Sequence, residues 1–414
     1  MMDYTYNFTA ITHPVRLFSG VDALDSLPYE LQRMDVHRVL VLSGRSVHEK
    51  TDLTQRVSAL CGERIALVFP RISEGAPRQD IEAAARLAAE LKVDCLIAIG
   101  AGSVTKAARV VAMLMAENKP LEQMATRYDE SGRATSTRLM APKVPIINVL
   151  TAATTSQNRA GSSIRDDALN HQLEFFDPKT RPKVIYWDAQ ALLTAPASLV
   201  HVAAGMEYWW GLMNVASAKN ENPLVQASRY HALKLARNAI QRVSDPTDWR
   251  ARIDLCAAAL LETRDEDDGG APLGGRPMRA HLVKRASYML AVGLFNTASG
   301  INQAKAMIGL TGSVLRTFGD LCPEIVLEIG EALGMGPANT GSIGDVNMIE
   351  RVATEFEAQF SAFGYTTNLH NEKVDPSEIP GIIGYALRVF NCNNDGLMND
   401  KEDRLRVALE LAIS

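Results

Sequence analysis

The chain has few cysteines, no excess of either charge and no long apolar run. Its five cysteines are scattered over 414 residues without a Cys-x-x-Cys pair, which favours free thiols in a reducing compartment over disulfides or a zinc site. The formal net charge of -5 lacks the basic excess of nucleic-acid binders. No apolar run reaches the roughly 18–20 residues of a membrane span, and the first residues lack a signal-peptide pattern. We therefore expect a soluble, cytoplasmic protein that binds neither nucleic acid nor membrane.

Short apolar runs alternate with helical patterns over the first 190 residues. Five runs rich in Val, Ile and Leu are typical of strands buried on both faces of a parallel sheet: residues 38–42, 64–69, 93–99, 144–150 and 183–187. Helical patterns lie between them, for example at residues 77–91. This alternation predicts an α/β domain with a doubly wound, mostly parallel sheet over residues 1–190.

The rest of the chain is helical in pattern. Helices are predicted over residues 196–214, 222–243, 248–261, 281–314, 324–333, 347–363 and 400–413. Between them lies ETRDEDDGGAPLGGRPM, residues 262–278, which is first acidic and then rich in Gly and Pro. We interpret this segment as a solvated surface loop. An all-helical C-terminal domain is therefore expected over residues 191–414.

The stretch at residues 93–115 joins a buried strand, a glycine-rich turn and the start of a helix. The turn consists of Gly100, Ala101, Gly102 and Ser103. Glycines let a phosphate approach the backbone, and the unpaired N–H groups of a first helical turn point toward it. The turn is a candidate anion site, although an ordinary strand-to-helix turn has the same local pattern.

With these landmarks the sequence resembles the iron-containing alcohol dehydrogenase family, in the superfamily that includes dehydroquinate synthase. Residues 100–103 match its GGGS turn, and further blocks match in the family's order: residues 144–158, 183–196, 203–207 and 219–224. The resemblance covers nearly the whole chain. It implies a nicotinamide-dependent dinucleotide-binding enzyme that assembles at least as a dimer, and we expect a homodimer.

The resemblance also implies a divalent metal held by one Asp and three His, and here the sequence departs from the family. The Asp-x-x-x-His pair is replaced by Glu207 and Gly211. Gln303 matches the third ligand position, and the fourth falls near Phe318 and Gly319. One glutamate and a neutral amide are a poor ligand set for Fe²⁺ or Zn²⁺. We expect no catalytic metal.

Three histidines near these segments are alternative ligands: His201, His231 and His281. Lone helical histidines are more often structural than metal-binding, so we do not assign them to the site.

The turn and the segment after the first buried strand point to the phosphates of a cofactor. Lys106 stands where the family has Asp, and Arg109 where it has Lys; both suit a polyphosphate, although Arg109 also fits an exposed helix face. NAD-preferring members carry an acidic residue after the strand at residues 38–42. Here that place is taken by Ser43, Gly44, Arg45 and Ser46. An arginine with hydroxyls in place of the carboxylate favours NADP(H) over NAD(H).

A hydroxyl-rich loop follows the strand at residues 144–150. Its Thr151, Thr154 and Thr155 are candidates for the pyrophosphate or the nicotinamide ribose. The alternative is that these hydroxyls satisfy only the loop's own backbone.

Without a metal, another group must stabilise or protonate the substrate oxygen. Glu207 suits a general acid or base if burial raises its pKa; otherwise it is a helix carboxylate bonded to a neighbour. Gln303 and Lys305 are two residues apart on one helix, so only one of them faces a cleft. Of Tyr208, Trp209 and Trp210, at least two are expected in the core, with one left to fill the metal's place or stack on substrate.

These observations predict an NADP(H)-dependent, metal-independent alcohol dehydrogenase or carbonyl reductase. Its substrate is a small molecule or a peptide, such as a secondary-metabolite or peptide hydroxyl. The alternative is a non-catalytic nucleotide-binding homologue that acts as a partner subunit. A metal-assisted lyase like dehydroquinate synthase needs the missing ligands.

Overall fold

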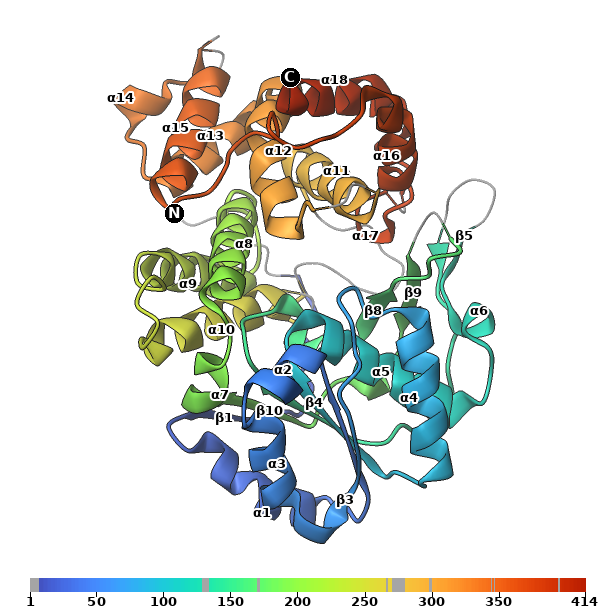
Figure 1. Ribbon diagram of the computed structural model, residues 1–414. Coiled ribbons are helices and arrows are strands. Elements are labelled where there is room, and N and C mark those ends of the chain that lie inside the picture. Colours follow the sequence, from blue (N-terminus) through green and yellow to red (C-terminus); the bar gives the residue numbers. More distant parts are fainter. Residues whose placement is uncertain are drawn as a thin grey trace.

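The computed structural model describes residues 7–128, 134–169, 172–265, 267–269, 280–297, 300–343, 345, 347–393 and 395–414. Figure 1 shows a sheet-containing half made by the N-terminal part of the chain and a helical half made by the C-terminal part. The strands end at Asp188 and helices follow, while the division into domains at residue 190 stays a prediction.

The central sheet has six strands, all parallel, in the order β1-β10-β7-β4-β2-β3. The strands are β1 (Arg16–Gly20), β2 (Val39–Ser43), β3 (Ile65–Phe69), β4 (Cys95–Gly100), β7 (Ile146–Leu150) and β10 (Val184–Asp188). Every residue of β2, β4, β7 and β10 is buried, as the continuous apolar runs indicate. The predicted doubly wound α/β fold is confirmed.

Helices cover both faces of the sheet. Strand residues such as Leu40 and Leu96 pack with α4 (Arg78–Glu90) and α5 (Gly102–Glu117). Their neighbours, such as Val41, face α1 (Leu27–Arg33) and α3 (Leu53–Cys61). The alternation follows from the two-residue period of a strand, which sends successive side chains to opposite faces.

The carboxyl ends of β2, β4 and β7 meet at one edge of the sheet. Ser43 pairs in register with Ile99, and Gly100 pairs with Leu150. Because β3 and β4 lie on opposite sides of β2, the strand order reverses here and leaves a crevice, which is where ligands bind in open α/β sheets. The short helix α2 (Arg45–Lys50) begins at this edge.

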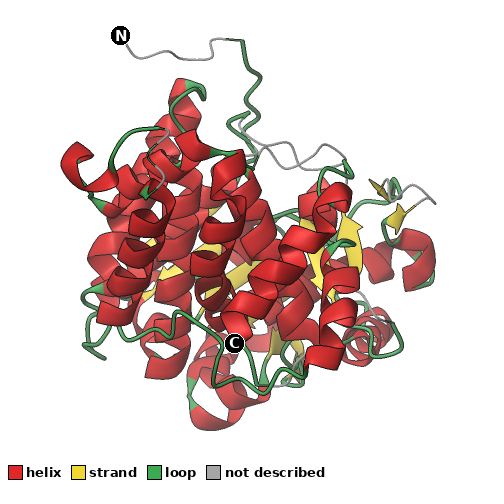
Figure 2. Cartoon of the chain, turned by 90° about the horizontal axis from the view of Figure 1, so that it is seen from above, coloured by secondary structure: helices red, strands yellow, loops and turns green. Residues whose placement is uncertain are grey.

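The helical half is one packed body with a continuous apolar core. Figure 2 shows its helices covering the strands from above. None of the described helices is both long and apolar enough to cross a membrane. Its helices are α7 (Ala189–Leu193), α8 (Ala197–Val215), α9 (Pro223–Ile240), α10 (Trp249–Arg264), α11 (Leu282–Thr297), α12 (Gln303–Phe318), α13 (Pro323–Leu333), α14 (Pro337–Thr340), α15 (Met348–Ala362), α16 (Ile379–Ala386), α17 (Phe390–Asn393) and α18 (Glu402–Ile413).

Two parts of the secondary structure differ from prediction. The single helix expected over residues 281–314 is divided into α11 and α12, because Gly300 has a φ of 84° and Asn302 caps α12 by accepting from the Lys305 N–H. The chain also forms two small antiparallel pairs that the sequence analysis missed: β5 (Arg127–Tyr128) with β6 (Ala134–Thr135), and β8 (Gly161–Ile164) with β9 (Leu173–Phe176).

Candidate active site

The glycine turn has the shape of a phosphate cradle. Gly100 has a φ of 155°, and a Cβ there would lie 2.8 Å from Val104 Cγ2. A Cβ on Gly102 would lie 3.3 Å from Thr154 Oγ1. Ser103 Oγ accepts from the Gly75 N–H at 3.1 Å, which fixes the neighbouring loop and leaves the first-turn N–H groups of α5 for a ligand. These residues fit the diphosphate of a dinucleotide.

The segment after β2 fits a nucleotide only in part. Ser43 is fully buried and its Oγ has no hydrogen-bond partner among the described residues, so its contact with a cofactor stays a prediction. Gly44 stands at the start of α2, where a Cβ would be 3.4 Å from the Ile72 carbonyl oxygen. Arg45 is 76% exposed, with Glu49 4.0 Å away, and Ser46 is exposed beside it. Arg45 and Ser46 are therefore open to a ligand at this edge.

The threonine loop is held partly by its own backbone. Thr151 is buried, and its N–H donates to the Gly100 carbonyl at 3.1 Å. Thr154 Oγ1 accepts from the Ser156 N–H at 3.1 Å and caps the short helix at residues 155–158, as the self-satisfying alternative predicts. Thr155 is half-buried, so its side chain keeps an accessible face.

Arg109 is neither an exposed cation nor a ligand group. It is 1% exposed. Its Nη1 donates to the Ser156 carbonyl oxygen and its Nη2 donates to Ser156 Oγ, both at 2.7 Å. Its Nε donates to Ser162 Oγ at 2.8 Å. Arg109 on α5 therefore binds the chain before Arg159, at Ser156, and after it, at Ser162. Lys106 is half-buried, and burial with the neighbouring Arg109 and Arg159 lowers its pKa to about 8.

Glu207 on α8 and Glu262 on α10 form a buried carboxyl pair, here called the acid pair. They are 2% and 6% exposed. Within the described residues, neither Glu262 oxygen nor Glu207 Oε2 has a donor partner apart from the other carboxyl. Burial raises the pKa of Glu207 to about 8, and burial together with the Glu207 carboxyl raises the pKa of Glu262 well above its usual range. Both carboxyls are therefore largely protonated at neutral pH, and because two adjacent buried carboxyls cannot both ionise, the pair gives up only one proton.

A strip of α8 continues from Glu207 through Trp210 to Asn214, which are near neighbours on one helix face. Lys284 on α11 donates to Asn214 Oδ1 at 2.5 Å and lies 5.1 Å from the centre of the Trp210 ring. Burial lowers the pKa of Lys284 to about 8. The Trp210 Nε1–H is buried and has no acceptor among the described residues. The strip is thus a polar wall with unused donors.

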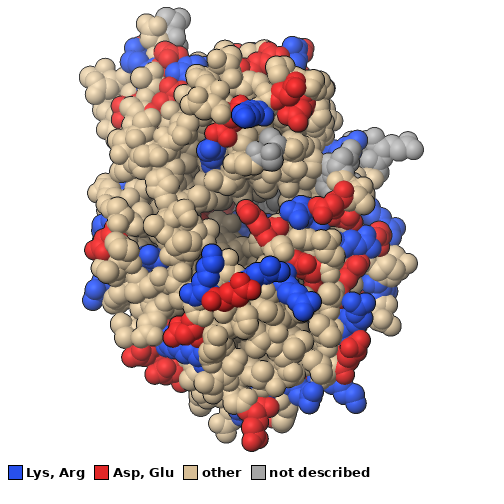
Figure 3. Space-filling view, viewed as in Figure 1, with Lys and Arg blue, Asp and Glu red and all other residues tan. Residues whose placement is uncertain are grey.

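The hydroxyl loop connects the acid pair to the sheet. Gln157 donates to the Cys256 carbonyl on α10 at 2.9 Å and accepts from the Trp187 indole at 2.8 Å. Arg159 follows on the same loop, close enough to influence the pKa values of Glu207 and Glu262. Figure 3 shows the surface hollowed between the sheet half and the helical half, with charged side chains along the rim.

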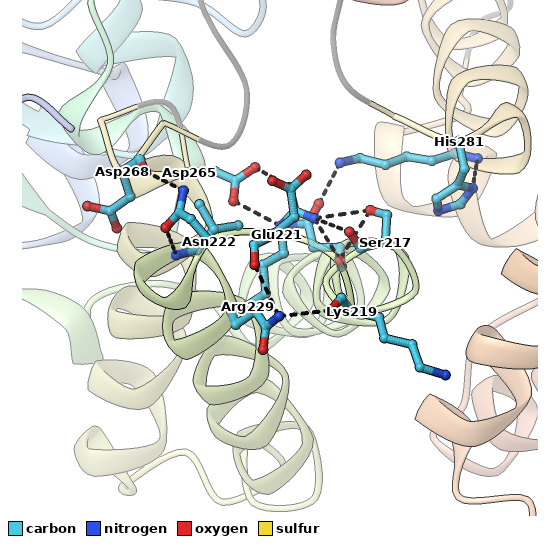
Figure 4. Close-up of polar contacts among 12 residues, drawn as sticks. Ser217, Lys219, Glu221, Asn222, Arg229, Asp265, Asp268 and His281 are labelled. Atoms are coloured by element: carbon cyan, nitrogen blue, oxygen red, sulfur yellow. Dashed lines mark hydrogen bonds and ion pairs between the residues drawn. The ribbon is translucent and has the colours of Figure 1, made fainter. Parts of the chain in front are cut away.

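The acidic segment after α10 is not solvated, contrary to prediction. Asp265 accepts from Arg229 Nε and Nη2 at 2.9 and 2.6 Å, and Asn222 Nδ2 donates to the Asp268 carbonyl at 2.8 Å. Figure 4 shows these contacts, in which Ser217 also takes part. Arg181 binds Asp267 at 2.8 Å, and both Asp265 and Asp268 are buried. The rest of the predicted loop, residues 266 and 270–278, lies outside the described residues.

The other predicted catalytic residues are not brought to Glu207. Lys305 forms an ion pair with Glu372 at 2.6 Å, and its role as electrophile stays a prediction. Gln303 is half-buried at the start of α12, and its role stays a prediction. The sequence analysis missed Glu262, Arg159 and Lys284. Only Arg159 carried a signal, because it directly follows the hydroxyl loop.

The aromatic residues after Glu207 divide as expected. Tyr208 and Trp209 are core residues, with Tyr208 Oη donating to Gln359 and Trp209 Nε1 donating to Thr311, both at 2.8 Å. Trp210 is the one that borders the polar wall.

The residues present do not fit the family's metal. A Cβ on Gly211 would lie 2.9 Å from the Leu233 Cα, so no ligand side chain fits there. His281 uses Nε2 on the Met213 carbonyl at 3.0 Å and Nδ1 on the Lys284 N–H at 3.1 Å, and His201 stacks on Tyr365. Across the part of the chain that the structure describes, no three His, Cys, Asp or Glu side chains are grouped to hold a metal.

The sequence is similar to a known family and to several enzymes. Residues 14–189 match a family described as iron-containing alcohol dehydrogenase. The maleylacetate reductase of Sphingobium indicum is 26% identical over 269 residues, which are 65% of this chain and 65% of that protein. The 4-hydroxybutyrate dehydrogenase of Cupriavidus necator is 26% identical over 301 residues, 69% of this chain and 76% of that protein. The match thus spans slightly less than two thirds of the maleylacetate reductase.

Solved structures share the fold over the whole chain. An NADH-dependent butanol dehydrogenase A from Thermotoga maritima superimposes with a TM-score of 0.80 at 16% identity and covers 100% of both chains. A sulfoacetaldehyde reductase from Bifidobacterium kashiwanohense, solved with NAD+, gives 0.75 at 16% identity and covers 99% of both chains. Residues 14–189, which carry the parallel sheet and its glycine turn, match the iron-containing alcohol dehydrogenase family, and the whole chain shares the fold of the solved structures.

Proposed function

We propose that the protein is an NADP(H)-dependent, metal-independent alcohol dehydrogenase or carbonyl reductase whose proton donor is the acid pair. The observation that carries this proposal is that the Glu207 and Glu262 carboxyls are both buried and that Glu207 Oε2 and both Glu262 oxygens lack a hydrogen-bond partner among the described residues. Glu207 stands at the position that the resemblance gives to the family's first metal ligand. The relatives named as dehydrogenases and reductases support hydride chemistry. The family's substrate oxygen is polarised by a metal; here a carboxylic acid takes over the task by donating a proton.

The chain's own residues divide the work. The glycine turn and the first turn of α5 hold the diphosphate, and exposed Arg45 with Ser46 suits a ribose 2′-phosphate. When bound, the reduced nicotinamide supplies the hydride. In reduction the doubly protonated pair gives one of its two protons to the carbonyl oxygen of the substrate; in oxidation the singly ionised pair takes the hydroxyl proton. Arg159 and Lys284 lie near enough to stabilise the single negative charge left on the pair.

The proposal is tested by titrating NADPH and NADH against intrinsic fluorescence and by following NADPH oxidation with a panel of aldehydes and ketones. We expect NADPH to bind more tightly than NADH and at least one carbonyl compound to be reduced. Tight NADPH binding without turnover on any carbonyl or alcohol would instead establish the non-catalytic partner subunit. Failure of both nucleotides to bind would overturn the proposal outright. The homodimer and the peptide or secondary-metabolite substrate stay predictions.

A further inference from the structure

Three cations gather where the hydroxyl loop meets α5: Lys106, Arg109 and Arg159. Arg109 is saturated by oxygens of Ser156 and Ser162. Ser162 Oγ in turn donates to the Lys106 carbonyl at 3.2 Å. The backbone on both sides of Arg159 is therefore fixed against the turn of α5 that carries Lys106, and the two side chains are held in one place.

Lys106 and Arg159, here called the cation pair, lack an anion. Among the described residues, neither side chain has an ion pair or a hydrogen bond, and the Arg159 Nε–H is buried without an acceptor. Several other buried or half-buried cations of this half have a carboxylate partner; Arg78, Lys143 and Arg181, for example, each contact one. Burying cations without a counter-ion costs folding free energy, so two half-buried cations without a partner indicate a site for an external anion.

The loop that carries Arg159 contacts both neighbouring elements: Ser156 accepts from Arg109 on α5, and Gln157 donates to the Cys256 carbonyl on α10, the helix that carries Glu262. Arg159 influences the pKa values of Lys106 on one side and of Glu207 and Glu262 on the other, yet it forms no ion pair with either glutamate. A substrate whose carbonyl oxygen meets the acid pair would thus extend past Arg159. We propose that Lys106 and Arg159 form a subsite for a carboxylate on the substrate, so that the protein acts on aldehyde or keto acids and the matching hydroxy acids. This inference rests on the proposed function for the reaction that follows binding.

A cofactor phosphate is the other anion that could occupy the cation pair. The first-turn N–H groups of α5 already supply donors for the diphosphate at residues 102–104. Lys106 lies one turn further along α5, and Arg159 reaches toward the acid pair. The position favours the substrate, and the experiment separates the two sources.

The experiment compares an aldehyde acid, succinic semialdehyde, with the neutral aldehyde butanal in NADPH-dependent reduction. In R159Q and K106M we expect KM for succinic semialdehyde to rise at least about tenfold, since each variant loses a charge-assisted contact. We expect KM for butanal and Kd for NADPH to change by less than about twofold, whereas a fall in kcat in R159Q should be equal for the two substrates, because Arg159 also lies near the acid pair. R406Q removes an exposed cation on α18 and serves as the matched control, with no change in KM for the acid.

Two results would overturn the subsite. One is a rise in Kd for NADPH in R159Q as large as the rise in KM for succinic semialdehyde, which would assign the cation pair to the cofactor. The other is a wild-type protein that prefers butanal. Succinate binding by calorimetry, with R159Q as the comparison, needs no turnover. If succinate binds the wild-type protein but not R159Q, and no carbonyl compound is reduced, the subsite stands and the proposed function fails. If carbonyl compounds are reduced but succinate does not bind, the proposed function stands and the subsite fails.

Discussion

The nucleotide end and the acid pair are built in different ways. The nucleotide end consists of three turns, residues 44–46, 100–103 and 151–155, each of which follows its own buried strand. Parallel pairing alone brings these turns to one edge. The acid pair instead joins Glu207 and Glu262 from separate helices, beside Arg159 from a loop and Lys284 from α11. The first region is encoded locally, whereas the second exists only when distant segments pack correctly.

The same comparison explains what happened to the family's metal site. The turn for the phosphates tolerates changes in its side chains, because backbone N–H groups do the binding. The metal site depends on side chains alone, so loss of one imidazole at Gly211 removes it. In the proposed function, the acid pair takes the place of the metal at this end.

Removing the acid of the pair gives the largest expected effect on activity. In E207Q and E262Q we expect kcat to fall by about 10²–10³, because a positioned general acid contributes a factor of that order. Kd for NADPH should stay unchanged, since the nucleotide end is separate. The measurement is steady-state reduction with parallel fluorescence titration, and E350Q, at an exposed glutamate paired with Arg316, is the control. Full kcat in both variants would exclude the pair as proton donor.

The pH dependence sharpens this test. The pKa of Glu207 is raised to about 8 by burial, so the folded protein binds a proton that the unfolded chain releases near its ordinary value of 4.5. Reduction should therefore slow as the pH rises through about 8, and oxidation should accelerate. Because the unfolded chain ionises Glu207 at a lower pH than the folded protein does, the free energy of unfolding should fall as the pH rises from about 4.5 to 8. The part of this fall that Glu207 causes should be absent from thermal melts of E207Q. A pH profile identical in wild type and E207Q would contradict the assignment.

Breaking the Asp265–Arg229 contact gives the next largest effect, on stability. Arg229 is buried and held by both oxygens of Asp265, so D265N leaves a buried cation with one carboxylate nearby, Glu221 at 3.8 Å, and otherwise neutral oxygens such as those of Ser217. We expect a loss of about 3 kcal/mol in the free energy of unfolding, measured by urea denaturation. E350Q breaks an exposed pair and should cost less than about 1 kcal/mol. Equal losses would mean that the acidic segment is as dispensable as a solvated loop.

The sequence analysis succeeded where local pattern decides structure. Continuous apolar runs identify β2, β4, β7 and β10, and the glycines identify the turn at residue 100. It failed for the segment from Glu262 to Asp268, because a run of acids looks solvated until partners such as Arg229 and Arg181 arrive from elsewhere in the chain. The hairpin of β8 and β9 was missed because its strands are short and one is mostly Gly and Ser.

The choice between nicotinamide cofactors is a smaller effect, confined to the nucleotide end. Arg45 is exposed at the edge of β2 and would give one charge-assisted contact to a 2′-phosphate. We expect R45S to weaken NADPH binding about tenfold and to leave NADH binding unchanged, as measured by fluorescence titration. Equal weakening of both nucleotides would place Arg45 on a phosphate that the two cofactors share.

The smallest expected effect is that of metal removal, and it bears most directly on the comparison between the two ends. After dialysis against a strong chelator we expect kcat to change by less than about twofold, because Gly211 leaves no room for a ligand and the described histidines near it are used elsewhere. Plasma mass spectrometry of the untreated protein should show a substoichiometric content of divalent metal. If the metal were instead stoichiometric and its removal abolished turnover, the acid pair would be a pair of ligands rather than a proton donor. In that case E207Q would lose metal together with activity, whereas a proton donor would lose activity alone.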